Sequence, residues 1–289
     1  MSTGPDITAA SKTGTNDDNV IFGAEQTEVE RLDMQHKVIH DANPRCVYAP
    51  LDLSKGGYKI LDQATGSGIW IRDARAEAGA DNEWVGTDIE DQWFPTTTPA
   101  DTTYKHQSMT EPWPVQWKGS FDLVHSRMAL PGVGINSLES AVKNLIALVK
   151  PGGWIQMCEL EWDGWNIGPE GKIFATAVRD LFTTVSAGQG VDLREKLIPI
   201  FKEAGLENID YTIVVTPFGA RASDKIRKTS EASLFATALG VSTTTKMLPP
   251  ISIPREQLDA MPQKLLEETK KEGWEYKHFV LWAQKPLKA

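Results

Sequence analysis

The chain is predicted to be an α/β domain, in which a seven-stranded, mostly parallel sheet carries helices on both faces. Short apolar segments alternate five times with helical patterns from residue 58 onward, and two strand patterns close the chain, at 209–219 and 275–284. The early strands end in small or acidic residues. Such alternation indicates βαβ units, because parallel neighbours need a long crossover connection that is usually a helix.

Composition limits the functions open to this domain. It has 289 residues, with 30 Lys and Arg against 39 Asp and Glu, a formal charge of −9 and a pI near 5.2. This balance argues against nucleic acid and anionic membranes as partners, since both attract basic faces. No run approaches the roughly 18 apolar residues of a membrane span, so a cytoplasmic protein is expected. The cysteines, Cys46 and Cys158, predict neither a disulfide framework nor a metal site.

The N-terminal part divides into a tail and a cap. Residues 1–19 are small and polar without periodicity, so a disordered tail is expected before a folded domain at 20–289. An amphipathic pattern then predicts a helix at 24–41, within a cap segment at 20–50 that lies outside the sheet.

Hydrophobic periodicity orders the elements that follow. We expect strands at 58–64, 83–89, 103–107, 121–125, 154–160, 209–219 and 275–284. Helices are expected through Trp70 and Ala74 and at 137–150, 172–186, 193–204, 222–239 and 255–271. Since no short loop joins the last two strands, the helical insertion at 221–272 must sit outside the sheet.

The helix at 137–150 has the strongest pattern, because its apolar residues recur on one face. Asn136 and Glu139 are spaced as a capping box at its start. Pro151, followed by two glycines, is expected to stop it.

A glycine-rich turn follows the first strand and carries the main functional signal. Small residues between Asp62 and Gly68 let the backbone approach a ligand at the carboxyl edge of a parallel sheet. The third glycine of a dinucleotide fingerprint is missing, and Asp88 lies 20 residues after Gly68, where a carboxylate can accept hydrogen bonds from ribose. The pattern favours a nucleoside without phosphates. The alternative is a tight turn at Gly66 and Gly68 beside a solvated Asp88.

These residues, with LVKPGGW before the fifth strand, resemble class I S-adenosylmethionine-dependent methyltransferases, which have a Rossmann-like fold. More narrowly, the chain resembles the fungal LaeA-like group, which includes the N-methyltransferase type of the gliotoxin pathway. The motifs are ERLDMQH at 30–36, GTDI followed by WFP, EPW at 111–113 and FDLVHSR at 121–127. The likeness covers 25–161. Beyond it, the helical segments at 162–205 and 221–272 are expected on the acceptor side.

The resemblance implies roles for the glycine loop and its surroundings. S-adenosyl-L-methionine would be the cofactor, with Asp62, Ala64, Thr65, Gly66 and Gly68 around its methionine moiety. Ala64 replaces the family's first glycine, which fits if this residue keeps a negative φ.

Further residues would contact the remaining parts of the cofactor. Asp88 would bind the ribose, and Ile89 would lie against the adenine. Family members often carry an acid where Ser108 and Met109 stand, so a hydroxyl or a backbone carbonyl would replace that contact. Gln35 would close the pocket from above.

Three residues are candidates for acid–base chemistry. His125 lies at the end of the fourth strand, near the expected methyl group, and His36 is on the cap helix. Glu159 and Glu161 leave the fifth strand, and one of them, with Glu159 as the candidate, is expected to face the acceptor. The alternative for both histidines is packing, and for the acid it is solvation.

Aromatic residues after the fifth strand suggest an acceptor wall. Trp162, Trp165, Phe174 and Phe182 cluster there. Flat rings suit an apolar or aromatic small molecule, or a cation formed during N-methylation. Ordinary helix packing is the alternative. A homodimer is possible.

The leading function is methyl transfer to N or O of a small secondary metabolite. Two alternatives stay open: a regulatory protein of the LaeA type, and a cyclase that binds the cofactor without transferring its methyl group.

Overall fold

The structure, a computed structural model, describes residues 21, 26–79 and 81–287, so the predicted tail at 1–19 lies outside the described part. Seven strands form one sheet in the order β3-β2-β1-β4-β5-β7-β6, with β7 antiparallel to both its neighbours and the other pairs parallel. This confirms the predicted fold class. The strands are β1 (Lys59–Gln63), β2 (Glu83–Asp88), β3 (Thr102–His106), β4 (Phe121–Arg127), β5 (Val149–Asn166), β6 (Glu207–Phe218) and β7 (Trp274–Gln284).

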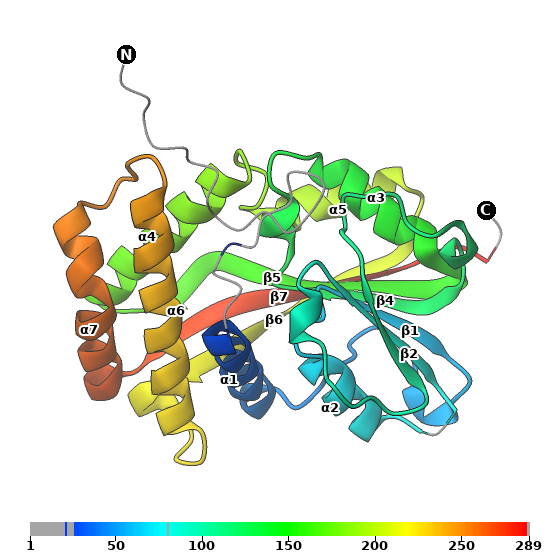
Figure 1. Ribbon diagram of the computed structural model, residues 1–289, viewed down its shortest axis with the longest axis horizontal. Coiled ribbons are helices and arrows are strands. Elements are labelled where there is room, and N and C mark those ends of the chain that lie inside the picture. The colour runs from blue at the N-terminus through cyan, green and yellow to red at the C-terminus, as the bar shows by residue number, and fades with distance from the viewer. Residues whose placement is uncertain (1–20, 22–25, 80, 288–289) are drawn as a thin grey trace.

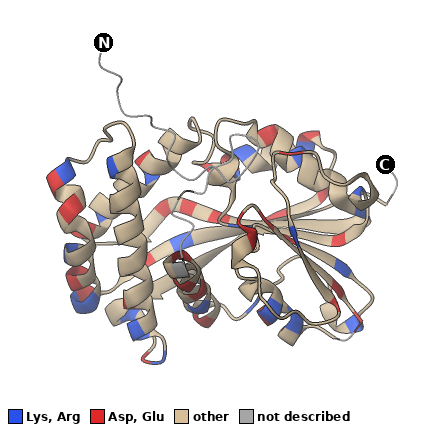
Figure 2. Ribbon diagram, in the orientation of Figure 1, with Lys and Arg blue, Asp and Glu red and all other residues tan. Residues whose placement is uncertain are grey.

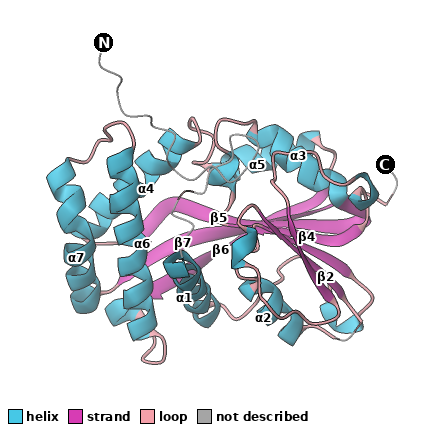
Figure 3. Ribbon diagram, in the orientation of Figure 1, coloured by secondary structure: helices cyan, strands magenta, loops and turns pink. Residues whose placement is uncertain are grey.

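Helices cover both faces of the sheet (Figures 1 and 3). They are α1 (Gln26–Ala42), α2 (Ile69–Glu77), α3 (Leu138–Leu148), α4 (Pro169–Val185), α5 (Leu193–Glu203), α6 (Arg227–Met247) and α7 (Arg255–Glu272). α3 and α5 pack on one face and α2 on the other, because the central strands are apolar on both sides. Ile60 and Leu61, adjacent in β1, are both fully buried and lie in different core clusters.

The insertion predicted at 221–272 does lie outside the sheet. Its helices α6 and α7 pack on each other, with α4 behind them and α1 against α6, at one end of the molecule (left in Figure 1). Charged residues of α6 occur only near its two ends, whereas α7 carries them along its length (Figure 2). The central turns of α6 are therefore suited to burial against other elements.

Several boundaries differ from the predictions. β5, expected at 154–160, continues to Asn166, so the first residues of the segment predicted as helical at 162–205 belong to the strand. Ser137, not Asn136, caps α3, because its side chain accepts a hydrogen bond from the backbone N–H of Ser140. The helix ends at Leu148, before the proline, and β5 begins at Val149 because this backbone pairs with Phe121 of β4. α6 continues to Met247, since its last turns pack on α7: Val241 lies in the same buried cluster as Leu258, and the Ser242 hydroxyl donates to the Leu258 carbonyl.

Cys46 and Cys158 are both buried free thiols. Among the described helices, none combines the length and the apolar character needed to cross a membrane.

Candidate functional site

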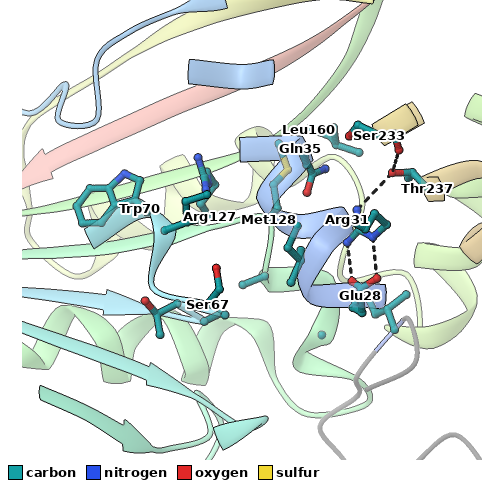
Figure 4. A pocket seen from close by; sticks show the side chains of 18 of the residues that line it. Glu28, Arg31, Gln35, Ser67, Trp70, Arg127, Met128, Leu160, Ser233 and Thr237 are labelled. Carbon is teal, nitrogen blue, oxygen red and sulfur yellow. Dashed lines mark hydrogen bonds and ion pairs between the residues drawn. The ribbon is translucent and has the colours of Figure 1, made fainter. Parts of the chain in front are cut away.

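A cavity of about 260 Å³ lies at the carboxyl ends of β1, β2 and β4, beneath α1 (Figure 4). One half is lined by the turn after β1, by Asp88 and by the segment after β3. The other half is lined by α4, α6 and the ends of β5, β6 and β7. A single space therefore joins the predicted cofactor residues to the helical segments predicted on the acceptor side.

The turn after β1 is held by its own polar groups. The Thr65 hydroxyl donates to Asp62 Oδ2 at 2.6 Å, and the Gly66 N–H donates to Asp88 Oδ2 at 2.8 Å. The φ of Gly66 is +54°, which glycine adopts without steric cost. Asp62, Ala64, Thr65 and Gly66, which the sequence predicts as cofactor-binding residues, all line the cavity.

Asp88 is buried at the end of β2 and lines the cavity. Its other oxygen accepts a hydrogen bond from the backbone N–H of Glu90 at 3.1 Å. Burial raises the pKa of Asp88 to about 6, although the backbone donors oppose that shift. The alternative prediction, in which Asp88 is a solvated acid at the end of the strand, is therefore wrong. The carboxylate is buried and hydrogen-bonded to the glycine turn.

Gly68 does not line the cavity. A Cβ at this position would lie 2.2 Å from the hydroxyl oxygen of Tyr104. Gly68 is the N-cap residue of α2 and has a φ of +74°. Gly68 serves close packing against Tyr104, and its predicted contact with a ligand is not supported by this placement.

Ala64 departs from the sequence expectation. Its φ is +56°, not negative, so an L-residue occupies a left-handed conformation where the family pattern has glycine. The backbone turns sharply there because Thr65 N–H bonds back to Thr87 of β2 at 2.9 Å.

The segment after β3 supplies an apolar side to the cavity. Met109 and Ile89 both line it. Ser108 does not: its buried hydroxyl accepts a hydrogen bond from the backbone N–H of Thr110 at 3.0 Å. The expected replacement of the family's acid by this hydroxyl is thus not supported, because the hydroxyl serves its own turn.

His125 lies behind the cavity. Its Nδ1 and Asp62 Oδ1 are 2.7 Å apart, and its ring stacks on Trp70 with centroids 3.8 Å apart. Burial lowers the pKa of His125, so the ring is neutral and donates to the carboxylate. This geometry favours the packing alternative over proton abstraction from an acceptor.

His36 is also withdrawn from the cavity. Its Nε2 lies 2.9 Å from Asp73 Oδ2, and its Nδ1 accepts from Arg127 at 2.8 Å. Burial, assisted by the Arg127 charge, lowers the pKa of His36 to about 3. Its neighbour Gln35 does line the cavity, as predicted.

Glu159 does not face the cavity either. Its Oε1 accepts hydrogen bonds from the backbone N–H groups of Ala129 and Leu130, each at 2.9 Å. Burial raises the pKa of Glu159 to about 7. The carboxylate shapes the turn after β4, and this placement offers no support for a catalytic role.

Aromatic rings surround the other half of the cavity. Trp165 and Phe174 line it, as predicted, whereas Trp162 stacks behind Trp165 and under the guanidinium of Arg179, in a neighbouring groove. Phe182, a member of the same predicted cluster, also lines it. Sequence reasoning missed three further lining rings, those of Phe218, Trp274 and Tyr276. The spacing of Trp274 and Tyr276, two apart at the start of a strand, could have indicated a shared face.

Polar residues on α1 and α6 were also missed. Glu28 and Arg31 line the cavity opposite Ser233 and Thr237 (Figure 4). Their helical spacing was visible, but nothing in the sequence links α1 to α6.

Two groups of potential metal ligands occur among the described residues: His36, His40 and Asp73, and His40, Cys46 and Glu77. The Arg127 guanidinium donates to His36, which places a positive charge beside the first group. The hydrogen bond between His36 and Asp73 accounts for their proximity, so the absence of a metal site stays a prediction.

Comparisons with known proteins identify the relatives of this chain. It is 31% identical over 262 residues to methyltransferase psoC of Aspergillus fumigatus, covering 90% of this chain and 95% of that one. It is 34% identical over 218 residues to N-methyltransferase sirN of Leptosphaeria maculans, covering 71% and 72%. The secondary metabolism regulator LAE1 of Hypocrea atroviridis is 27% identical, over 49% of this chain and 40% of its own length.

Among solved structures, the chain is similar to Haemonchus contortus phosphoethanolamine N-methyltransferase 2 in complex with S-adenosyl-L-methionine. Its TM-score is 0.45 at 15% identity, over 89% of this chain and 52% of that one. No family model matches the chain. On the strength of its curated relatives, the chain belongs to the fungal methyltransferases of secondary metabolism and uses S-adenosyl-L-methionine to methylate a small molecule.

Proposed function

We propose that this methyltransferase acts on a nitrogen atom of a small, mainly apolar metabolite. The observation that carries the proposal is the single cavity, which has the glycine turn and Asp88 at one side and six aromatic rings at the other. Aromatic faces favour a flat acceptor and the positive charge that develops on a methylated nitrogen. The name of the relative sirN, an N-methyltransferase, points the same way.

The residues around the glycine turn would then hold the cofactor. Asp88 would accept hydrogen bonds from the ribose hydroxyls, Ile89 and Met109 would pack against the adenine, and Ala64 to Gly66 would lie beside the methionine moiety, since all of them line the cavity. The cofactor supplies an activated methyl group. The chain positions the acceptor in line with it and excludes water, and both effects accelerate such a displacement.

No general base is assigned. His125, His36 and Glu159 are each engaged with other protein groups outside the cavity. An unprotonated nitrogen needs only to be held in position. Cytoplasmic location and a homodimer stay predictions.

The test is methyl transfer from ¹³C-methyl S-adenosylmethionine into extracts of fungal cultures grown on ¹⁵N nitrogen. A product with a directly bonded ¹³C–¹⁵N pair, formed with equimolar S-adenosylhomocysteine, supports N-methylation. A ¹³C-methyl group on oxygen corrects the accepting atom. Cofactor binding without any labelled product would favour the regulatory or the cyclase alternative.

A further inference from the structure

We propose that Glu28, clamped by Arg31, receives a hydrogen bond from the acceptor, and that the acceptor is an uncharged, mainly apolar molecule with an N–H or O–H donor on one edge. The inference rests on the proposed function, because it concerns the aromatic half of the same cavity. It names a recognition group that the cofactor site does not require.

Glu28 and Arg31 lie one turn apart on α1 and form a two-pronged ion pair. Arg31 donates through Nε and Nη2 to the two Glu28 oxygens, at 2.7 and 2.6 Å. Its Nη1 also donates to the Thr237 hydroxyl at 3.3 Å, and that hydroxyl donates to the Ser233 carbonyl at 2.8 Å (Figure 4). The network holds the Glu28 carboxylate in one orientation between the cap helix and α6.

This pair is buried at the edge of an apolar chamber. Arg31 is 6% exposed and the Glu28 side chain 11% exposed, yet both line the cavity. Burying an ion pair costs desolvation that an apolar pair of similar size would avoid. A role in recognition gives a reason for its presence among the aromatic rings.

Glu28 has hydrogen-bonding capacity left for a ligand. A carboxylate offers about four lone-pair sites, and Arg31 uses two of them. The other carboxylates lining the cavity, Asp62 and Asp88, bond to groups of the glycine turn and the segment after β2. Within the described residues, Glu28 is thus the lining carboxylate on the acceptor side, and it complements a donor.

The charges of the chamber select against a charged acceptor. Arg31 neutralises Glu28, and residues 232–245 of α6 contain no charged side chain (Figure 2). An ammonium entering this space would lose hydration without gaining an unpaired negative charge, because Arg31 already pairs with Glu28. A carboxylate would lie beside the Glu28 carboxylate, and the other lining cation, Arg127, lies at the end of β4 and donates to His36. A neutral donor loses far less and bonds to Glu28.

The experiment measures binding of four phenylalanine derivatives to the full chain saturated with S-adenosylhomocysteine, by ligand-observed NMR titration. N-acetylphenylalaninamide is neutral with N–H donors, N-acetylphenylalanine is anionic and phenylalaninamide is cationic. N-acetyl-N-methylphenylalanine dimethylamide is neutral without a donor. The first should bind at least about tenfold more tightly than the others, the size expected for one hydrogen bond to a charged group.

Variants assign that preference to the pair. Glu28→Gln, and the charge-free double variant Glu28→Gln with Arg31→Met, should abolish it. Glu30→Gln, an exposed position on the same helix, should keep it. S-adenosylhomocysteine affinity within about twofold of wild type in each variant shows an intact fold and cofactor half.

Equal binding of the four probes, no binding of any of them, or an unchanged preference in Glu28→Gln overturns the inference. Failure of the wild-type chain to bind S-adenosylhomocysteine would instead count against the proposed function.

Discussion

His125 and Asp62 share a buried hydrogen bond of 2.7 Å at the floor of the cofactor half of the cavity. The imidazole donates through its edge and the carboxylate accepts, while Trp70 stacks on a face of the same ring. His125 thereby fixes the acid that begins the glycine turn. Its influence on methyl transfer should pass through Asp62.

We expect His125→Asn to weaken cofactor binding while kcat falls less than about 10-fold, because general-base removal costs roughly 100-fold or more. The pH profile should keep any limb near neutrality. Steady-state kinetics against pH check this, with His106→Asn, an exposed histidine at the end of β3, as the control. A 100-fold loss of kcat together with a lost limb would make His125 the base, by the same typical magnitude.

Asp88 should make cofactor affinity depend on pH. Its pKa is raised from 3.8 to about 6, so below pH 6 the Asp88 carboxyl group of the folded apo protein is mostly protonated. It must lose this proton before both of its oxygens can accept hydrogen bonds from the ribose. S-adenosylhomocysteine should therefore bind up to about 10-fold more weakly at pH 5 than at pH 7, since only the ionised fraction accepts both bonds. Calorimetry across this range measures the effect.

Two variants of Asp88 sharpen the test. Asp88→Asn should remove the pH dependence, and Asp88→Ala should weaken binding by about 1.5 to 3 kcal/mol, the range for hydrogen bonds to a charged group. Asp91→Asn, exposed in the next turn, should leave both unchanged. An affinity that rises as pH falls to 5 would contradict the assignment.

The stability of the apo protein should depend on pH in the opposite sense to cofactor affinity. The Asp88 contribution should increase the free energy of unfolding as pH falls from 6 toward 3.8, because the folded state binds the Asp88 proton more tightly than the unfolded state does.

Ser67 ties the glycine turn to the cap helix. Its hydroxyl donates to Asp33 Oδ1 at 2.5 Å. In a double-mutant cycle of Ser67→Ala and Asp33→Ala, the free energies of S-adenosylhomocysteine binding should show a coupling of about 0.5 to 1.5 kcal/mol, because one hydrogen bond holds α1 over the cofactor. Additive changes in binding free energy would mean that α1 and the glycine turn contribute to cofactor binding independently of this hydrogen bond.

The sheet could be predicted because hydrophobic periodicity is a local property. Both strands around the glycine turn end in residues whose chemistry is visible in the sequence, so Asp62, Gly66 and Asp88 were found together. The acceptor half is different: Arg31 and Thr237 are 206 positions apart and meet only because α6 packs on α1. Tertiary packing of this kind leaves no periodic signal in one sequence.

The direction of side chains was the second property that could not be predicted from the sequence. His125, His36 and Glu159 have suitable chemistry, but each bonds to a protein group on another segment and turns away from the cavity. Trp162 fails for a related reason, because the pairing of β5 with β7 becomes irregular between Glu161 and Asn166. A break in strand pairing changes which face a ring occupies, and composition does not reveal it.

Ala64 provides a stability test of the glycine turn. Its φ of +56° brings Cβ close to the following carbonyl oxygen, which costs an L-residue roughly 1 to 2 kcal/mol. Glycine avoids this cost but loses more conformational entropy on folding, by roughly 0.5 to 1 kcal/mol relative to alanine.

Ala64→Gly should therefore stabilise the apo protein by about 0.5 to 1 kcal/mol, raising Tm by about 1 to 3 °C. The matched control is Ala78→Gly, since Ala78 has a φ of −91° after α2 and should lose stability on the same change. Thermal unfolding compares the two variants directly. Ala64 also lines the cavity, where its methyl group narrows the space beside the cofactor. Removing that methyl group should therefore not weaken S-adenosylhomocysteine binding. A lower Tm for Ala64→Gly, matching that of Ala78→Gly, would show that the left-handed conformation carries no cost at this turn.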